Sequence, residues 1–197
     1  MSLSRTVMRS LRLFQILWIL AGMPALLSAG VMVTLETNLG VMRFELWPEV
    51  APKTVANFVK LAGEGFYDGT AFHRVIKGRV VYGGDPLSKD SGQAPNWGTG
   101  GPGYSIEAEL NERKHEFGVL SMDHNGNPNS AGSRFLICLA PSPNLNRRYT
   151  AFGKLVSGAE VLKKIGKVPV KAIASGERSR PTRRVAIESI RSVESRP

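Results

Sequence analysis

Phe72-His73-Arg74-Val75-Ile76, followed after six residues by Gly83-Gly84-Asp85-Pro86, is the stretch of this sequence that decides its interpretation. The first run has the apolar, β-branched composition of a buried strand, yet its centre carries the guanidinium of Arg74. A buried Arg is rare unless an acid pairs with it or the protein uses it. The strand alone favours a structural Arg that pairs with a core carboxylate. Because a Gly- and Pro-rich loop follows, a functional role for Arg74 remains an alternative.

The sequence around this stretch predicts many short strands joined by turns. Strands are predicted at residues 31–37, 41–46, 71–82 with a break at 77–78, 117–122, 134–140, 151–156 and 184–193. Helices are predicted at residues 52–62, which Pro52 opens, and at residues 159–165. Short strands with two helices and turn-rich connections predict an all-β fold, a closed antiparallel barrel capped by the helices.

The net charge of +10 is concentrated at the two ends of the 197-residue chain. Residues 1–30 carry a charge of +3 and residues 163–197 a charge of +7, whereas the charges between them cancel. Proteins that hold nucleic acid usually present a basic face with aromatic platforms, so nucleic acid is not the expected partner. Charged ends of this kind suit an anionic membrane surface or an acidic partner.

The first 30 residues have the pattern of a targeting or anchoring segment. Three Arg residues precede an uncharged span, residues 13–33, which contains the small residues Ser28-Ala29-Gly30 near its end. This order is typical of a secretory signal peptide, and the span is also long enough for an uncleaved membrane anchor. The sequence therefore predicts an exported or membrane-anchored protein on the periplasmic or extracytoplasmic side of a membrane, with mitochondrial import as an alternative. Residues 31–197 are predicted to form the folded domain, with a solvated basic loop at 171–184.

The usual catalytic and metal-binding patterns are absent from the sequence. His73, His115 and His124 do not fall at metal-ligand spacing, and no Cys cluster supports them. Cys138 lies in an apolar run that predicts a buried, inert thiol. Ser133 is not in a nucleophile elbow, and no pair of carboxylates stands out. An enzyme with this sequence is therefore expected to work without a nucleophile, a metal or a cofactor.

Further motifs follow one another along most of the chain. They are Thr37-Asn38-Leu39-Gly40, Ala51-Pro52-Lys53-Thr54-Val55-Ala56-Asn57-Phe58, Tyr67-Asp68-Gly69-Thr70, Gly100-Gly101-Pro102-Gly103-Tyr104, Leu120-Ser121-Met122, Ser130-Ala131-Gly132-Ser133 and Phe152-Gly153-Lys154. Together with the two opening motifs, they resemble the cyclophilin family of peptidyl-prolyl isomerases, particularly its compact bacterial members, from about Val31 to Val193. The resemblance implies an eight-stranded barrel with a helix over each end and a shallow groove for proline on its side.

The same resemblance implies a peptidyl-prolyl cis-trans isomerase that acts on proline-containing peptides, with Arg74 as its catalytic residue. Rotation about a peptide bond costs ~18–20 kcal/mol, and proline leaves the exchange slow although cis and trans are close in energy. In the twisted transition state the prolyl nitrogen regains a lone pair. A fixed guanidinium stabilises that state more than it stabilises the planar amide. Because no bond breaks, the reaction needs no cofactor.

By resemblance, the groove beside the catalytic Arg is lined by Arg79, Val80, Tyr82, Asp123, His124, Arg134, Leu136, Leu145 and Tyr149. Several of these residues depart from the pattern of the family. Arg79 stands where family members usually have Phe, and Tyr82 stands where they usually have Gln. Arg134 replaces the Gln that helps to hold the catalytic Arg. Asp123 and His124 replace an Ala and an Asn or Arg.

The groove therefore loses an aromatic wall and gains charge. Arg74, Arg79 and Arg134 are expected to meet there, with Asp123 as the counter-ion, because like charges in a half-buried site destabilise one another unless they are neutralised. The predicted function is peptidyl-prolyl isomerisation that is weak or absent toward ordinary apolar-Pro peptides. Two alternatives remain open. One is a catalytically inactive cyclophilin-like subunit of a membrane protein complex, and the other is a binder of acidic proline-containing peptides that uses the Arg cluster.

Overall fold

The structure, a computed structural model, describes residues 30–193, so the predicted targeting segment lies outside the described residues except for Gly30. Its strands are β1 (Val31–Thr37), β2 (Gly40–Leu46), β3 (Arg74–Ile76), β4 (Val80–Gly83), β5 (Val119–Met122), β6 (Phe135–Cys138), β7 (Ala151–Ser157), β8 (Val170–Ala172), β9 (Arg178–Pro181) and β10 (Ile187–Val193). Its helices are α1 (Pro52–Gly63), α2 (Ala159–Gly166) and the short 3-10 helices η1 (Pro86–Lys89), η2 (Ser91–Asn96), η3 (Pro128–Ser130) and η4 (Pro143–Leu145). The predicted strands and helices are present at the expected places, with ends that differ by a few residues.

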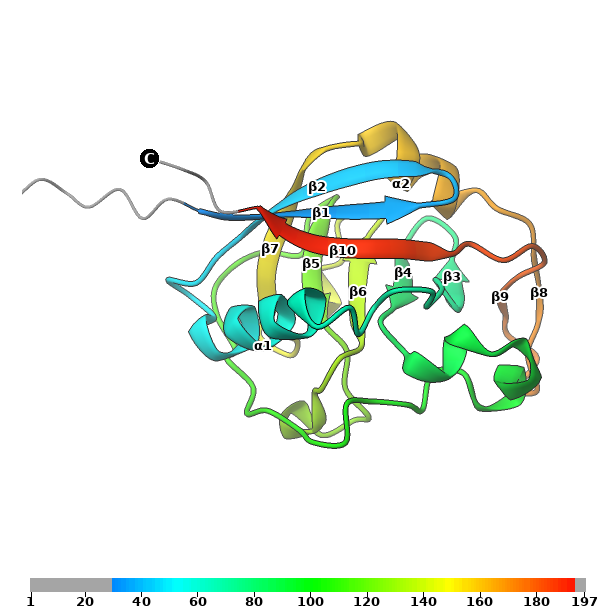
Figure 1. Ribbon diagram of the computed structural model, residues 1–197, viewed down its shortest axis with the longest axis horizontal. Helices are drawn as coiled ribbons and strands as arrows, with labels where there is room; N and C mark the ends of the chain where they lie inside the picture. The colour runs from blue at the N-terminus through cyan, green and yellow to red at the C-terminus, as the bar shows by residue number, and fades with distance from the viewer. Residues whose placement is uncertain (1–29, 194–197) are drawn as a thin grey trace, which may run out of the picture.

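Eight of the strands form one curled antiparallel sheet in the order β10-β1-β2-β7-β5-β6-β4-β3 (Figure 1). The prediction of a closed barrel is wrong, because the edge strands β10 and β3 do not pair along their length. The chain before β3 meets the chain before β10 at the isolated bridge between Ala71 and Ala186, beside a hydrogen bond of 2.9 Å from Phe72 N to Val185 O. β3 is only three residues long and forms no ladder of hydrogen bonds with β10. The sheet is therefore an open half-barrel.

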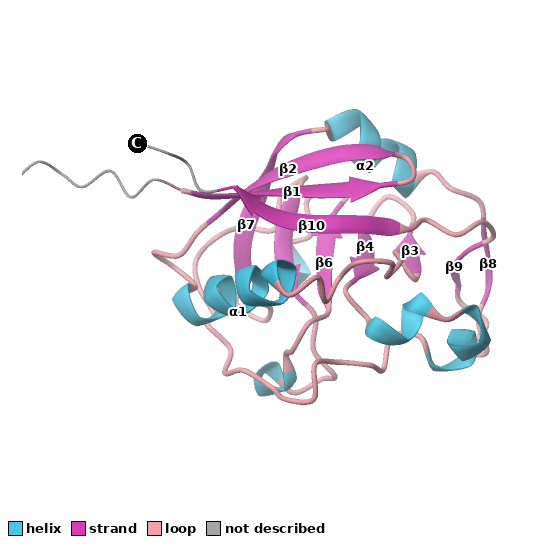
Figure 2. Cartoon of the chain, viewed as in Figure 1, coloured by secondary structure: helices cyan, strands magenta, loops and turns pink. Residues whose placement is uncertain are grey.

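The hydrophobic core lies within the curl of the sheet and against the two α-helices, which Figure 2 shows at opposite ends of the sheet. Pro52 occupies the first turn of α1, where its fixed φ suits a helix and its missing N–H is not needed. Phe58 lies on the buried face of α1, with its ring centre 5.1 Å from that of Tyr67. The same ring lies 5.6 Å from Phe135 of β6 and 5.2 Å from Phe152 of β7. One aromatic side chain thus joins α1 to both strands.

Residues 171–184 were predicted to be a solvated loop, but β8 and β9 form a two-stranded hairpin there. A hydrogen bond of 2.9 Å from Ile173 N to Glu177 O closes the turn, and Gly176 supplies the φ of 84° that the turn requires. β9 packs against β3 at the edge of the sheet (Figure 1). The segment is largely exposed, as predicted, but it contains two strands that were not predicted. The buried side chain of β9 is Ser179, so the sequence of the hairpin shows no hydrophobic alternation.

Within residues 30–193, no helix combines the length and the apolar character needed to cross a bilayer. The predicted anchor, residues 13–33, falls mostly on residues that are not described. Its last three residues, 31–33, belong to β1. The folded part that the structure describes therefore starts immediately after the predicted targeting segment.

Replacing Phe58 with Ala is expected to lower the free energy of unfolding by about 3–5 kcal/mol, because the side chain is 1% exposed and its removal leaves a cavity. Urea-induced unfolding, followed by tryptophan fluorescence, measures the change. Val156→Ala is the control, because Val156 is 52% exposed and its truncation is expected to change the free energy by less than about 0.5 kcal/mol. A loss below about 1 kcal/mol in the Phe58 variant would contradict the role assigned to this ring.

Candidate active site

The outward face of the sheet carries the predicted catalytic strand and its neighbours. The register places Arg74 of β3 opposite Tyr82 of β4, and Tyr82 opposite Leu136 of β6. Side chains alternate between the two faces of a strand, so the adjacent Val75 and Val81 point into the core. Arg74, Tyr82 and the buried Leu136 therefore form a row of neighbouring side chains on the outward face, and Arg74 lies at the end of this row.

Arg74 is held by a carboxylate and by an aromatic ring. Its Nε and Nη2 donate hydrogen bonds to Oε1 and Oε2 of Glu177 at 2.9 and 2.7 Å. Its guanidinium carbon lies 4.9 Å from the centre of the Tyr82 ring. Hydrogen bonding from Arg74 lowers the pKa of Glu177 to about 2, and the same interaction raises the pKa of Arg74. The side chain of Arg74 is still 37% exposed, so a ligand can reach it.

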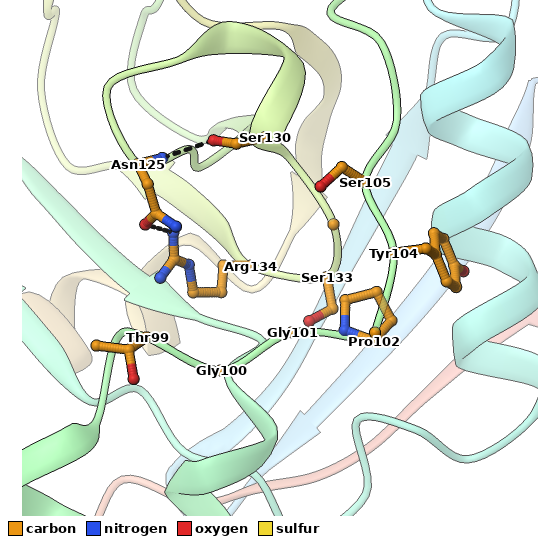
Figure 3. Close-up of a pocket in the computed structure, with 12 residues that line it drawn as sticks. Thr99, Gly100, Gly101, Pro102, Tyr104, Ser105, Asn125, Ser130, Ser133 and Arg134 are labelled. Atoms are coloured by element: carbon orange, nitrogen blue, oxygen red, sulfur yellow. Dashed lines mark hydrogen bonds between the residues drawn. The ribbon is translucent and has the colours of Figure 1, made fainter.

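Arg134 precedes β6 and is buried among hydrogen-bonding partners. Its Nε lies 3.2 Å from Oδ2 of Asp123, with the two side chains 6% and 16% exposed. Its Nη1 and Nη2 donate to the carbonyl oxygen of Gly98 and to Oδ1 of Asn125, the second of which Figure 3 shows. Burial raises the pKa of Asp123, and the charge of Arg134 opposes that rise. Asp123, the predicted counter-ion of the site, thus neutralises Arg134.

The three guanidiniums that were expected to meet in the groove have separate surroundings. Arg79 is exposed in the turn that joins β3 to β4. Arg74 pairs with Glu177 and Arg134 pairs with Asp123, so each of these two charges has its own carboxylate. The groove therefore presents no cluster of uncompensated Arg side chains. That cluster was the basis for expecting a binder of acidic peptides.

The apolar side chains predicted for the groove come together in one cluster. The cluster contains the buried Val80, Val119, Leu136, Cys138, Leu145 and Ala151 and the partly buried Trp47, Ile76, Tyr82 and Tyr149. Burial raises the pKa of Tyr82 to about 12, so its hydroxyl group stays neutral. Burial also raises the pKa of the Cys138 thiol to about 12, which agrees with the predicted inert thiol. The partly exposed rings form the surface of this cluster that a ligand can contact.

The histidines at positions 73, 115 and 124 have different environments. His124 stacks on Tyr149, with ring centres 4.2 Å apart and planes inclined by 20°, so two predicted groove residues contact each other. His115 Nε2 lies 3.0 Å from Oγ of Ser121 beneath the groove. Burial lowers the pKa of His73 to about 4. Across the described part of the chain, the His, Cys, Asp and Glu side chains form no group of three that could hold a metal ion.

Two cavities lie near the ion pair of Arg134 and Asp123. One, of about 220 Å³, adjoins Arg74 and is bordered by Arg180 of β9. The other, of about 360 Å³, lies beside residues 99–105 (Figure 3). Arg134 lines the second cavity, and its partner Asp123 lines the first. The two members of the ion pair thus line different cavities.

Sequence reasoning missed the residues that loops and the hairpin bring to Arg74. Glu177 is the only acid within the basic segment 171–184, and this isolation is the signal that could have singled it out. Trp97 and Arg180 also line the smaller cavity, with the Arg180 guanidinium carbon 5.5 Å from the centre of the Trp97 ring. No sequence pattern links these two residues, because Trp97 follows η2 and Arg180 belongs to β9, far away in the chain.

Comparison with known proteins identifies the family of this chain. The family model for cyclophilin type peptidyl-prolyl cis-trans isomerase/CLD matches residues 32–192. The chain belongs to this family. Peptidyl-prolyl cis-trans isomerase B of Bacillus subtilis is 53% identical over 124 residues, which cover 62% of this chain and 80% of that protein. A peptidyl-prolyl cis-trans isomerase of Synechococcus elongatus is 48% identical over 120 residues, which cover 61% of this chain and 77% of that protein.

Solved cyclophilin structures agree with this assignment. A cyclophilin type peptidyl-prolyl cis-trans isomerase of Cryptosporidium parvum has a TM-score of 0.73 at 34% identity, covering 85% of this chain and 99% of that one. A crystal structure of the same protein in the presence of the dipeptide Ala-Pro has a TM-score of 0.72 at 34% identity, covering 83% and 99%. The chain is therefore a peptidyl-prolyl cis-trans isomerase, and the resemblance inferred from its motifs is confirmed.

Replacing Arg134 with Gln is expected to raise the pKa of Asp123 further, because the cation that opposes the effect of burial is removed. NMR titration of the Asp123 carboxyl carbon in the full chain measures the shift. A raised pKa means that the ionised carboxyl destabilises the folded state, so the variant is expected to lose more stability at pH 7 than at pH 4. The expected loss at pH 7 is roughly 2 kcal/mol, below the value for a fully buried pair, because Asp123 keeps some solvent contact.

Arg43→Gln, which removes an exposed Arg of β2, is the control for the loss of one positive charge. It is expected to leave the pKa of Asp123 unchanged and the free energy of unfolding within about 0.5 kcal/mol of the wild-type value. If the pKa of Asp123 stays the same or falls in the Arg134 variant, the assigned ion pair is wrong.

Proposed function

We propose that this cyclophilin rotates Xaa-Pro bonds at the row of side chains that begins with Arg74, and that Arg74 is its catalytic residue. The proposal is carried by one observation, the position of this guanidinium. It is partly exposed at the end of a row whose next members, Tyr82 and Leu136, belong to the outward apolar cluster. A proline ring resting on that cluster would place its amide nitrogen beside a fixed cation.

The proposed chemistry follows from what the guanidinium can donate. Glu177 accepts hydrogen bonds from Nε and Nη2 of Arg74, so the two N–H groups of Nη1, which lie outside this pair, are the donors proposed to face a substrate. When the Xaa-Pro bond twists, the prolyl nitrogen leaves resonance with the carbonyl group and becomes an acceptor. An N–H aimed at that nitrogen binds the twisted amide more strongly than the planar one. A charge-assisted hydrogen bond of about 1.5–3 kcal/mol that forms only in the twisted state accelerates exchange roughly 10- to 100-fold.

The apolar cluster supplies the proposed binding surface for proline. Val80, Leu136 and Leu145 form its buried part, below the partly exposed rings of Tyr82 and Tyr149. Aromatic rings offer a large apolar contact area, and a proline ring placed on them leaves water. The Cryptosporidium parvum protein that was crystallised in the presence of Ala-Pro supports a proline-containing ligand for this groove.

The polar rim of the groove is proposed to set the choice of substrate. Its members are Arg79, Asp123, His124 and Arg134, all of them at positions where the sequence departs from the family pattern. The ion pair of Arg134 with Asp123 leaves the rim polar without a large excess of charge. Turnover of ordinary apolar-Pro peptides is therefore expected to be reduced rather than abolished. The alternative of an inactive subunit of a membrane complex gains no support from the relatives, which are named as isomerases.

We also propose that residues 1–30 direct the protein out of the cytoplasm, as a signal peptide or as a retained membrane anchor, with mitochondrial import as an alternative. The proposal is supported by the Arg residues and the uncharged span of this segment. Exposed Lys163 and Lys164 of α2 contribute to the positive charge of residues 163–197. An anionic membrane surface, or a membrane protein complex, is the partner that this basic end would favour.

Replacing Arg74 with Ala is expected to lower kcat/KM for an Ala-Pro peptide about 100-fold, because the donor for the prolyl nitrogen is lost. NMR exchange spectroscopy at several peptide concentrations measures the rate in the full-length chain. Arg43→Ala, at an exposed site on β2, is expected to keep the wild-type rate. A wild-type rate in the Arg74 variant would refute the catalytic assignment, and absence of exchange in the wild-type chain would favour the inactive subunit.

Mass spectrometry of the intact mature protein, purified from the organism that expresses it, tests the role of residues 1–30. Cleavage is expected to remove about 30 residues if the segment is a signal peptide. Retention of the segment together with recovery in the membrane fraction supports the anchor. A full-length chain recovered entirely outside membranes would contradict both forms of the proposal.

A further inference from the structure

The hairpin of β8 and β9 brings to the site a carboxylate that no family motif predicts. β9 packs against β3, and the hydrogen bond from Ile173 N to Glu177 O holds the turn closed beside Arg74. Glu177 and Arg74 are 103 positions apart in the chain. Their contact is therefore a consequence of how the hairpin docks at the open edge of the sheet.

We propose that Glu177 is the positioning residue of the catalytic guanidinium, an assignment that rests on the proposed role of Arg74. Its two oxygens accept hydrogen bonds from Nε and Nη2 in the two-pronged arrangement that fixes both the direction and the plane of a guanidinium. The Tyr82 ring, 4.9 Å from the guanidinium carbon, contributes a second contact. Together the two partners restrict a side chain that otherwise samples many rotamers.

The residue that would hold Arg74 by resemblance to the family cannot do so in this chain. Arg134 stands in place of the usual Gln, and a guanidinium has no acceptor atom for a hydrogen bond from Arg74. Its own nitrogens are already bound, one of them to Asp123. Arg74 therefore needs an anion from another direction, and Glu177 supplies it. In this chain Arg74 is thus held by the hairpin carboxylate, with Arg134 at the position of the usual Gln.

This positioning is expected to help the reaction. A carboxylate weakens the field of the guanidinium, but it also fixes the directions in which the remaining N–H groups point. The reaction needs a donor aimed at one nitrogen atom, and a displacement of about 1 Å can cost roughly 100-fold in rate. Nη1 lies outside the two hydrogen bonds to Glu177, and the Arg74 side chain is partly exposed. Loss of Glu177 is therefore expected to lower kcat and to leave substrate binding nearly unchanged.

Glu177→Gln tests this inference, because it keeps the shape of the side chain but removes its charge and one acceptor oxygen. In the full-length chain with an Ala-Pro peptide, kcat is expected to fall about tenfold while KM stays within about twofold. The Arg74 Nε–H signal, identified by its absence in Arg74→Ala, is expected to exchange faster with solvent. Glu188→Gln, which replaces an exposed Glu of β10, is the matched control and is expected to show wild-type values.

The outcomes separate this inference from the proposed function. An unchanged or raised kcat in Glu177→Gln, with Arg74→Ala inactive, would overturn the positioning role and leave the function of Arg74 intact. Absence of turnover in the wild-type chain would overturn both. Glu177→Asp retains the charge on a shorter side chain, and a wild-type kcat in this variant would also count against positioning. Thermal unfolding of every variant distinguishes a change at the site from a loss of the fold.

Discussion

Arg74 reaches the groove because burial of the inward-facing side chains fixes the register of β3, β4 and β6. Val75 and Val81 lie in the core, so Arg74, Tyr82 and Leu136 share the outward face. A shift of one residue would send the guanidinium into the core and bring the valines to the groove. The position of the cation is thus determined by core packing, before any contact with a substrate. The apolar cluster depends on the same register, since its members from these strands occupy the same face.

Arg74 and Arg134 fit into this groove because each of them has its own carboxylate. Arg134 pairs with Asp123 from the end of β5, and Arg74 pairs with Glu177 from the hairpin. An unpaired charge at the buried Arg134 would carry a large desolvation penalty, whereas the partly exposed Arg74 keeps contact with water. The two pairs let the site depart from the family pattern in several residues while its net charge stays low. The rim of the groove is polar, and an apolar cluster lies beneath it.

The open edge of the sheet explains why a hairpin takes part in the site. β3 is short and has no ladder with β10, and β9 packs beside it. Natural sheets commonly cover such edges, because exposed strands invite pairing with other chains. In this cyclophilin the covering element also borders the cavity beside Arg74, through Arg180. One element thus protects the edge of the sheet and completes the surroundings of the guanidinium.

Local patterns and ordered motifs were enough to identify the family, the short strands, the two helices and the groove positions that gather near Arg74. Val80, Leu136 and Leu145 could be predicted as neighbours because the family resemblance rests on motifs within short segments. The open sheet, the hairpin at 171–184 and the bond between Glu177 and Arg74 could not be predicted in this way. Each of these features depends on backbone hydrogen bonds or ion pairs that form only when segments far apart in the sequence pack together. No short stretch of sequence carries that information, so the tertiary structure alone decides it.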